Sequence, residues 1–182
     1  AHLIKNGAHQ LLDTLMAGGW ITHLATNGAG VIHDWEWAHH GRSTESVRAN
    51  VATGTFGTWE ETGRCLHLAV LTGALREEGF GQSVGRMVAE NGFTLPARLE
   101  LETKLREEPS HALAPARAEL LQIITQHNLA KGRHEIAHPW GATSVLGNAF
   151  RHDVPLTVHP GIGYDIISNH PLFNGAALGR AL

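Results

Sequence analysis

The glycine turn Asn27-Gly28-Ala29-Gly30 is the feature that most constrains the fold of this chain. It follows a segment, Trp20–Thr26, in which apolar and β-branched residues alternate with polar ones, as in a strand. The next residues, Val31–Ala38, predict a helix, and Asp34 and Glu36 suit the positive end of its dipole. A glycine turn between strand and helix is typical of a ligand-binding corner in an α/β domain.

A second unit of the same kind lies near the other end of the chain. Val154–Val158 predicts a strand, His159–Gly163 a glycine turn, and Tyr164–Ser168 the start of a helix. Strands that alternate with helices predict a parallel sheet in a single domain covering 1–182. Because two strands do not make a stable sheet, we expect further strands before Ala1, after Leu182 or in segments that look irregular.

Helical periodicity covers most of the remaining chain. The segment 93–130 is the most polar of these regions and is expected to be a peripheral helical insertion. Lys131-Gly132-Arg133 is expected to be a loop. The predicted helices cover residues 3–17, 43 or 44 to 52 with Ser43 or Thr44 as cap, 58–78, 83–90, 96–109, 115–128, 142–151 and 174–182.

Composition excludes several classes of function. The net charge is −3 and the basic residues are scattered, so neither nucleic acid nor an anionic membrane is an expected partner. No run of about 18 apolar residues predicts a membrane span, and no signal peptide is visible. The single cysteine, Cys65, lies in an apolar helical pattern and is expected to be a buried thiol, which agrees with a cytoplasmic location.

Polar residues gather around the two glycine turns. His33 and Asp34 follow the first turn, and His159 and Asp165 flank the second. If the two strands are neighbours, Asp34 and Asp165 could face one crevice, where carboxylates and histidines suit a cationic amine and proton transfer. The alternative is that both aspartates only stabilise the first turns of their helices. Glu60 and Glu61 could join this cluster, although solvent exposure is the favoured expectation.

A metal-binding alternative comes from His134-Glu135-Ile136-Ala137-His138, which matches the HExxH pattern of zinc hydrolases. That pattern needs a helix, whereas Pro139 disfavours helical backbone at His138. A third ligand would come from His152, His159 or a later acid. The pair His39-His40 is expected to be exposed rather than a metal site, and no metal is assigned.

Several segments together resemble the deoxyhypusine synthase family and its bacterial homologues. They are Ala1-His2-Leu3-Ile4-Lys5-Asn6-Gly7, Ala25–Asp34 with the sequence ATNGAGVIHD, Phe56–Gly63, and Val154–Ile167. The similarity covers most of the chain outside 93–130, and the Ala25–Asp34 motif is its most specific part.

The resemblance implies a helix-rich, doubly wound parallel sheet that binds NAD, in a homotetramer with cofactor sites between subunits. In the family, NAD oxidises a polyamine and an aminoalkyl unit passes through an imine on a lysine to an acceptor, which can be a protein lysine. The matched positions imply that the cofactor contacts Thr26, Asn27, Gly28, Ala29, Gly30 and Gly161. They imply that the amine substrate contacts His33, Glu61 and Asp165, with His33, Asp34 and His159 as candidate catalytic residues.

Three departures from the family pattern weaken the expected chemistry. His33 replaces a carboxylate near the polyamine, and Pro160 replaces an aspartate. The family's catalytic lysine lies in a later segment, and Lys5, Lys104 and Lys131 do not match its motif. We therefore expect either a fragment of a longer enzyme or a homologue that binds NAD without catalysis.

Overall fold

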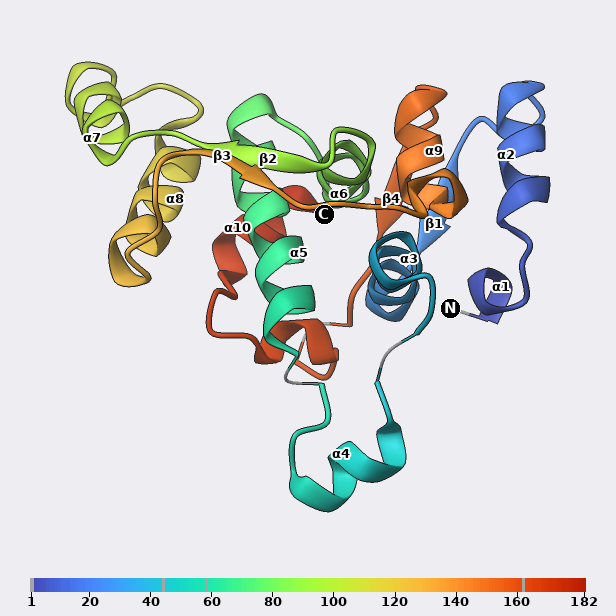
Figure 1. Ribbon diagram of the computed structural model, residues 1–182. Helices are drawn as coiled ribbons and strands as arrows, with labels where there is room; N and C mark the ends of the chain where they lie inside the picture. Colours follow the sequence, from blue (N-terminus) through green and yellow to red (C-terminus); the bar gives the residue numbers. More distant parts are fainter. Residues whose placement is uncertain (1, 44, 58, 162) are drawn as a thin grey trace.

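The structure is a computed structural model that describes residues 2–43, 45–57, 59–161 and 163–182. It is a helix-rich α/β chain with few strands (Figure 1). Short 3₁₀ turns, η1 (Ala74–Arg76), η2 (Gly141–Thr143) and η3 (Ile166–Asn169), join some of the elements. The helices are α1 (His2–Lys5), α2 (His9–Ala17), α3 (Gly28–His40), α4 (Val47–Thr53), α5 (Glu60–Gly73), α6 (Phe80–Ala89), α7 (Arg98–Glu107), α8 (Ala114–Gln126), α9 (Val145–Arg151) and α10 (Gly175–Ala181).

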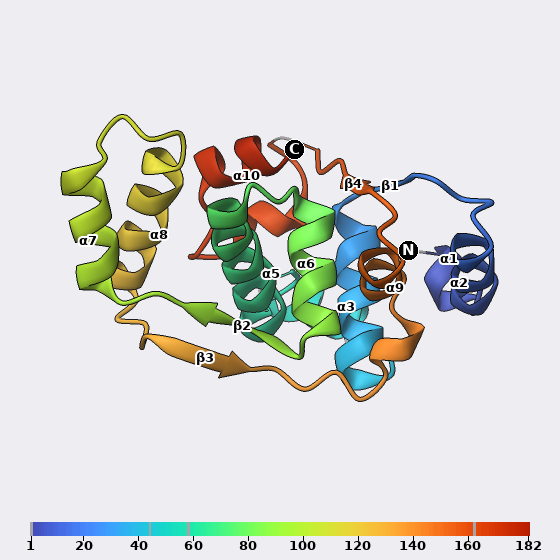
Figure 2. The same cartoon turned by 90° about the horizontal axis from the view of Figure 1, so that it is seen from above.

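The described strands form two separate pairs. Strands β1 (Leu24–Thr26) and β4 (Leu156–Val158) are parallel, with Ala25 opposite Thr157. Strands β2 (Gly92–Leu95) and β3 (Gly132–Glu135) are antiparallel and form a long ribbon along one side of the helices (Figure 2). The first pair contains the two strands expected from the sequence, in shorter form, and it has the expected parallel direction.

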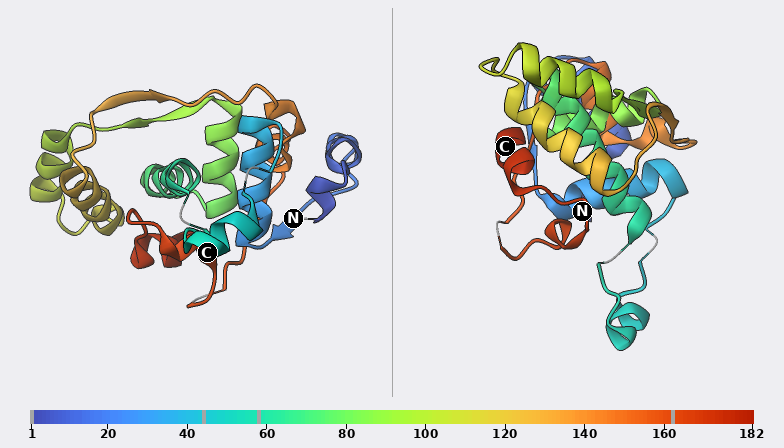
Figure 3. Two further views of the ribbon diagram at one scale, coloured as in Figure 1. Left: turned by 60° about the horizontal axis from the view of Figure 1, so that its bottom comes forward. Right: turned by 90° about the vertical axis from the view of Figure 1, so that its left-hand side faces the viewer.

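The hydrophobic core lies among α3, α5 and α6, which stand side by side in Figure 2. Trp35 of α3, Leu66 of α5 and Val84 of α6 are all at most 1% exposed there. Helix α4 projects away from this core and buries none of its described residues (Figure 3). Among the described residues, no helix is both long and apolar enough to cross a membrane.

The region 93–130 is less peripheral than its polarity suggests. Helices α7 and α8 do lie at one end of the molecule (Figure 1), and the outer surface of α7 is charged. However, Phe93 and Leu95 of β2 and Leu120 and Ile124 of α8 are buried members of the central core. Leu120 and Ile124 thus face inward as the helical pattern predicts, whereas the core contribution of Phe93 and Leu95 was not predicted.

Several expected elements differ from the structure. The expected loop Lys131-Gly132-Arg133 leads into strand β3, and the strand β2 was not predicted at all. Neither pairs with β1 or β4, so the expected parallel sheet is limited to two strands among the described residues. The N-cap of α4 is Ser46, whose Oγ accepts a hydrogen bond from the N–H of Ala49, and not Ser43. The alternative cap, Thr44, lies outside the described residues.

A buried carboxylate joins α3 to α9. Asp34 is 1% exposed, and its Oδ2 accepts hydrogen bonds from Ser144 Oγ at 2.6 Å and from the N–H of Leu146 at 3.0 Å. Its Oδ1 accepts a bond from the N–H of Val145 at 2.8 Å. These donors form the unpaired first turn of α9, which such a carboxylate caps well. Burial raises the pKa of Asp34, and the three hydrogen bonds oppose that rise.

We predict that Asp34→Ala lowers the free energy of unfolding by roughly 2–4 kcal/mol, because buried donors lose a charged acceptor. Chemical denaturation followed by circular dichroism measures this difference. The matched control is Asp13→Ala, which removes an exposed carboxylate paired with His152 at 2.8 Å and should cost at most about 1 kcal/mol. Equal losses in the two variants would contradict the structural role of Asp34.

Candidate functional site

The two glycine turns lie next to each other at the carboxyl ends of β1 and β4. The pairing continues one step beyond the strands, since the N–H of His159 donates to the carbonyl of Thr26 at 2.7 Å. Asn27 is the N-cap of α3, and its Oδ1 accepts from the N–H of Gly30 at 2.9 Å. The expectation that the strands are neighbours is therefore confirmed, and their turns form one corner.

Close packing explains both glycines at the start of α3. A methyl group on Gly28 would lie 2.6 Å from the Asp165 carboxylate, and one on Gly30 would collide with Thr26 Oγ1. Asp165 also binds its own turn, since its Oδ2 accepts from the N–H of Gly161 and its Oδ1 from that of Ile167, each at 3.3 Å. An acidic side chain thus lies beside the positive end of α3, where it is electrostatically favourable.

The candidate catalytic residues are not gathered in one crevice. Asp34 is engaged by α9, so it does not share a crevice with Asp165 as the sequence suggested. His159 is exposed at the corner, with its Nε2 2.9 Å from Thr157 Oγ1. His33 is half-buried on α3; burial, and secondarily the charge of Lys5, lower its pKa to about 4. His33 is therefore neutral at pH 7.

A small cavity opens between α3, α5 and η3. It has a volume of about 40 Å³ and presents two carboxylates, from Glu36 and Glu45. Glu36 is 2% exposed and lies in the middle of α3. Glu45 precedes α4, and its Oε1 accepts from the N–H of Gly57 at 2.6 Å and from Asn50 Nδ2 at 3.2 Å. The cavity is lined by Ile32, Glu36, Glu45, Gly57, Trp59, Thr62, Gly63, Leu66, Ile166, Ile167 and His170.

The other cavity walls combine an aromatic ring, a hydroxyl and a histidine. Trp59 and Thr62 come from the start of α5, and the Thr62 hydroxyl is buried without a hydrogen-bond partner in the described part of the chain. His170 Nε2 lies 3.0 Å from Glu60 Oε2 at the cavity rim. Sequence reasoning did not single out Glu45, Trp59 or His170, because nothing in the local pattern indicates that segments more than 100 residues apart meet here.

Glu61 lies outside this cavity, although the resemblance implied that it contacts the substrate. It is exposed, and its Oε1 is 2.8 Å from His40 Nε2. Glu60 is also exposed, as expected, but it pairs with His170. The first turn of α5 therefore uses both acids to bind histidines.

The zinc-hydrolase pattern does not have the backbone that it needs. His134 and Glu135 lie on β3, not on a helix, and the His134 ring stacks on Phe93. Glu135 is exposed and pairs with Arg133. His138 is buried near α3 and is the one histidine of the pattern that approaches other histidines. The cause is the extended β3, which separates residues that a helix would place on one face.

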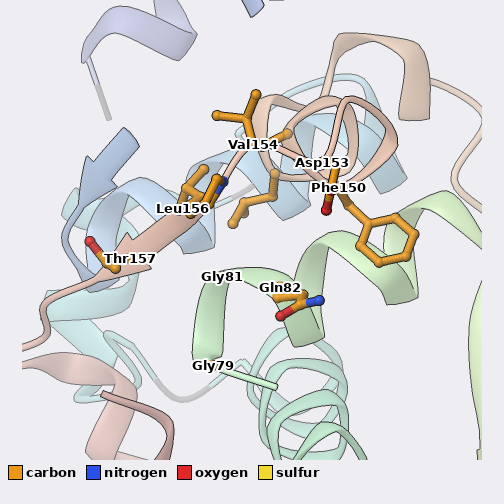
Figure 4. A pocket seen from close by; sticks show the side chains of 11 residues that line it. Gly79, Gly81, Gln82, Phe150, Asp153, Val154, Leu156 and Thr157 are labelled. Atoms are coloured by element: carbon orange, nitrogen blue, oxygen red, sulfur yellow. The ribbon is translucent and has the colours of Figure 1, made fainter. Parts of the chain in front are cut away.

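Two further hollows hold fewer chemical groups. A groove of about 220 Å³ lies between the start of α6, the end of α9 and β4, where Figure 4 shows Gln82 and Asp153 among apolar side chains and glycines. A slot of about 110 Å³ lies behind the second turn, between Gly161 and α10, with Phe173 in its wall. Neither combines paired charges with an aromatic ring as the Glu36–Glu45 cavity does.

Cys65 is a mostly buried thiol, as the sequence predicted. It is packed against the hydrophobic core on α5. Burial, with a contribution from Glu61, raises the pKa of Cys65 to about 12, so the thiolate does not form at pH 7. It is therefore not a nucleophile in this site.

Comparisons with protein-family models, with curated proteins and with solved structures found nothing that matches this chain.

His67 connects α5 to the wall of the cavity. It is 5% exposed, and its Nε2–H donates to the carbonyl of Ile167 at 2.8 Å. Its ring stacks on His170 and meets Phe173 edge to face. Burial is the main reason that the pKa of His67 is lowered to about 4, and the neighbouring His170 adds to this.

We predict that His67 makes the fold sensitive to acid. Below pH 6.5 the unfolded chain binds a proton at this histidine, whereas the folded chain does not until about pH 4, so stability falls over that window. At pH 5 the loss from this residue amounts to roughly 2 kcal/mol. Denaturation at pH 7 and pH 5 should show a smaller loss in His67→Phe, which keeps the ring contacts.

The control for this measurement is His127→Ala, which removes an exposed histidine at the end of α8. It should retain the pH dependence of the parent protein. If His67→Phe also loses as much stability between pH 7 and pH 5 as the parent does, the buried neutral histidine is not the cause.

Proposed function

We propose that this protein binds the ammonium group of a polyamine-type substrate in the Glu36–Glu45 cavity and NAD at the corner above it. The cavity carries the proposal. Two carboxylates beside an aromatic ring are the groups that recognise an organic cation. About 40 Å³ holds one group of the size of a water molecule, which is also the size of an ammonium head.

The charge balance of the cavity favours a cation over an anion. Glu36 and Glu45 line it, and no lysine or arginine does so among the described residues. Glu36 is held on α3 near the core, so its position is fixed by packing. Glu45 uses Oε1 to bind the turn at Gly57, which leaves Oε2 as an acceptor for a ligand.

The corner fits part of a dinucleotide. Ala29 is exposed in the first turn of α3, where free N–H groups and the helix dipole favour a phosphate. Asp165 at Gly28 would repel a phosphate placed directly over it, but it suits the hydroxyl groups of a ribose. Thr26, Asn27, Gly30 and Gly161 supply the surrounding surface, and the parallel β1–β4 pair would be the centre of a doubly wound sheet.

Bound NAD would supply the hydride acceptor for oxidation of the carbon that bears the amine. The residues of this chain bind and orient the amine and take up its proton. Of the candidate catalytic residues, His159 has an exposed ring at the corner proposed for the cofactor, whereas Asp34 is occupied by α9. Asp165 orients the cofactor side of the corner.

Transfer of the oxidised unit to an acceptor would need a lysine at the cavity. Lys5, Lys104 and Lys131 do not line the cavity, and Lys104 is paired with Glu100 on α7. The described residues are therefore proposed to bind the amine and to support its oxidation, but not to transfer the oxidised unit. The homotetramer and a protein lysine as acceptor stay predictions of the resemblance.

Spermidine is the probe for the amine site. Isothermal titration should detect its binding to the parent chain, and Glu45→Gln and Glu36→Gln should each weaken it roughly tenfold or more, because each removes one charge-assisted hydrogen bond. Glutamine at position 45 still offers an oxygen to the N–H of Gly57, so the turn is kept.

The matched control is Glu102→Gln, an exposed residue on α7 far from the cavity, which should bind spermidine like the parent. A diol of the same length should not bind, since it lacks the charge. Unchanged spermidine affinity in both cavity variants would remove the amine site, whatever the result with NAD.

NAD binding is tested at Ala29. Ala29→Asp places a carboxylate in the exposed first turn of α3, where it is compatible with the helix and repels the cofactor phosphates. We expect NAD affinity to fall at least about tenfold, measured by calorimetry. Ala49→Asp makes the same change in the exposed first turn of α4 and should leave NAD affinity unchanged. Failure of NAD to bind the folded parent would refute the cofactor assignment.

A further inference from the structure

Two histidines and a glutamate meet where the end of α3 approaches the start of α5. His39 and His40 form the last turn of α3, and Glu61 lies in the first turn of α5. One ligand atom of each residue lies within 4.8 Å of the corresponding atoms of the other two. His40 Nε2 and Glu61 Oε1 are already 2.8 Å apart. None of the three residues lines the proposed amine cavity.

A backbone contact prepares His39 to be a ligand. Its Nδ1 lies 2.6 Å from the carbonyl oxygen of Ala137. A carbonyl only accepts, so Nδ1 carries the hydrogen and Nε2 of the neutral ring keeps a lone pair. Metal-binding histidines commonly have this arrangement, in which a carbonyl fixes the tautomer and the orientation of the ring.

A third histidine stands beside the cluster. His138 is only 7% exposed, and neither of its ring nitrogens has a hydrogen-bond partner in the described part of the chain. Its ring centroid lies 5.9 Å from that of His39, and the rings of His39 and His40 are 4.5 Å apart. A buried imidazole without partners is costly, and a water molecule bound to a nearby cation would reduce that cost by a hydrogen bond to the ring.

The surrounding backbone also favours a cation. The carboxyl end of α3 carries the negative end of the helix dipole, close to both of its histidines. The segment that holds His138 is fixed against the same helix end, since the N–H of Trp140 donates to the carbonyl of Ala38 at 3.1 Å. Three segments that are distant in sequence therefore converge on one point.

We propose that His39, His40 and Glu61 bind a divalent transition-metal ion of the zinc type, with a water molecule as the fourth ligand and the buried His138 ring beside it. Imidazole nitrogens and one carboxylate oxygen are ligands that zinc, cobalt and nickel accept. The ion takes the place of the direct His40–Glu61 contact. It joins α3 to α5, and the carbonyl of Ala137 holds His39 beside it, so the site is structural and its occupancy stabilises the fold.

Cobalt and zinc are the probes for this site. After treatment with a chelator, the parent chain should bind one Co²⁺, with the intense visible absorption of a four-coordinate centre, and Zn²⁺ should displace it. His40→Ala and Glu61→Gln should each weaken Co²⁺ binding at least about tenfold. Zn²⁺ should raise the melting temperature of the parent and raise it much less in these two variants.

Two controls make the result specific. His127→Ala removes an exposed histidine far from the cluster and should bind Co²⁺ like the parent. His138→Phe keeps the three proposed ligands, so it should still bind Co²⁺, with a shifted visible absorption because the ring beside the bound water is changed. Circular dichroism of the metal-free variants checks their folding, and the exposed, isosteric Glu61→Gln decides the question if an alanine variant does not fold.

Two results would overturn the proposed metal site. The cluster does not hold the metal if the parent binds no Co²⁺. The same conclusion follows if the double variant with His39→Ala and His40→Ala binds Co²⁺ with the parent's affinity and spectrum. Since spermidine and NAD bind elsewhere in the proposal, a negative metal result leaves those two assignments standing.

Discussion

The carboxylate of Asp34 is the interaction on which much of the structure depends. It lies inside the protein and caps the first turn of α9 through three hydrogen bonds. Helix α9 leads directly to β4, and α3 follows directly from β1, so this contact fixes both helices that adjoin the parallel pair. A buried acid is tolerated only where its hydrogen bonds are satisfied, which is the case here.

Helix α3 carries three different surfaces along its length. Its first turn forms the corner with β4, its middle presents Glu36 to the cavity, and its last turn offers His39 and His40. The buried side of the same helix, including Val31 and Trp35, is completely covered by the core. One rigid element can therefore support binding groups at fixed spacings, because its rotation and tilt are set by packing and by Asp34.

The local sequence pattern predicted the elements whose structure depends mainly on neighbouring residues. The strand–turn–helix unit at Asn27–Gly30 is present, and the two strands pair in parallel as expected. In the second unit the expected helix Tyr164–Ser168 is instead the 3₁₀ turn η3, and Ile162 of the turn lies outside the described residues. The ribbon β2–β3 was missed because Gly92–Leu95 is short and Gly132–Glu135 is polar, so neither shows a clear alternation. The cavity was missed because Glu45, Trp59 and Ile166 meet only through tertiary packing. The HExxH pattern drew attention to His138, but it requires a helix, whereas His134 and Glu135 lie on strand β3.

The parallel pair of strands has a consequence for how the chain folds. Thr157 contacts Leu24 across 133 positions of sequence, whereas α5 packs on α6 and α7 packs on α8, which follow each other directly along the chain. Contacts with such a long sequence separation carry a large loop-closure cost and slow the folding of small domains. The corner should therefore be completed after the helical core, when the folding barrier has been passed. Substitutions at this corner would then act chiefly on the rate at which the native protein opens, and little on the rate at which it forms.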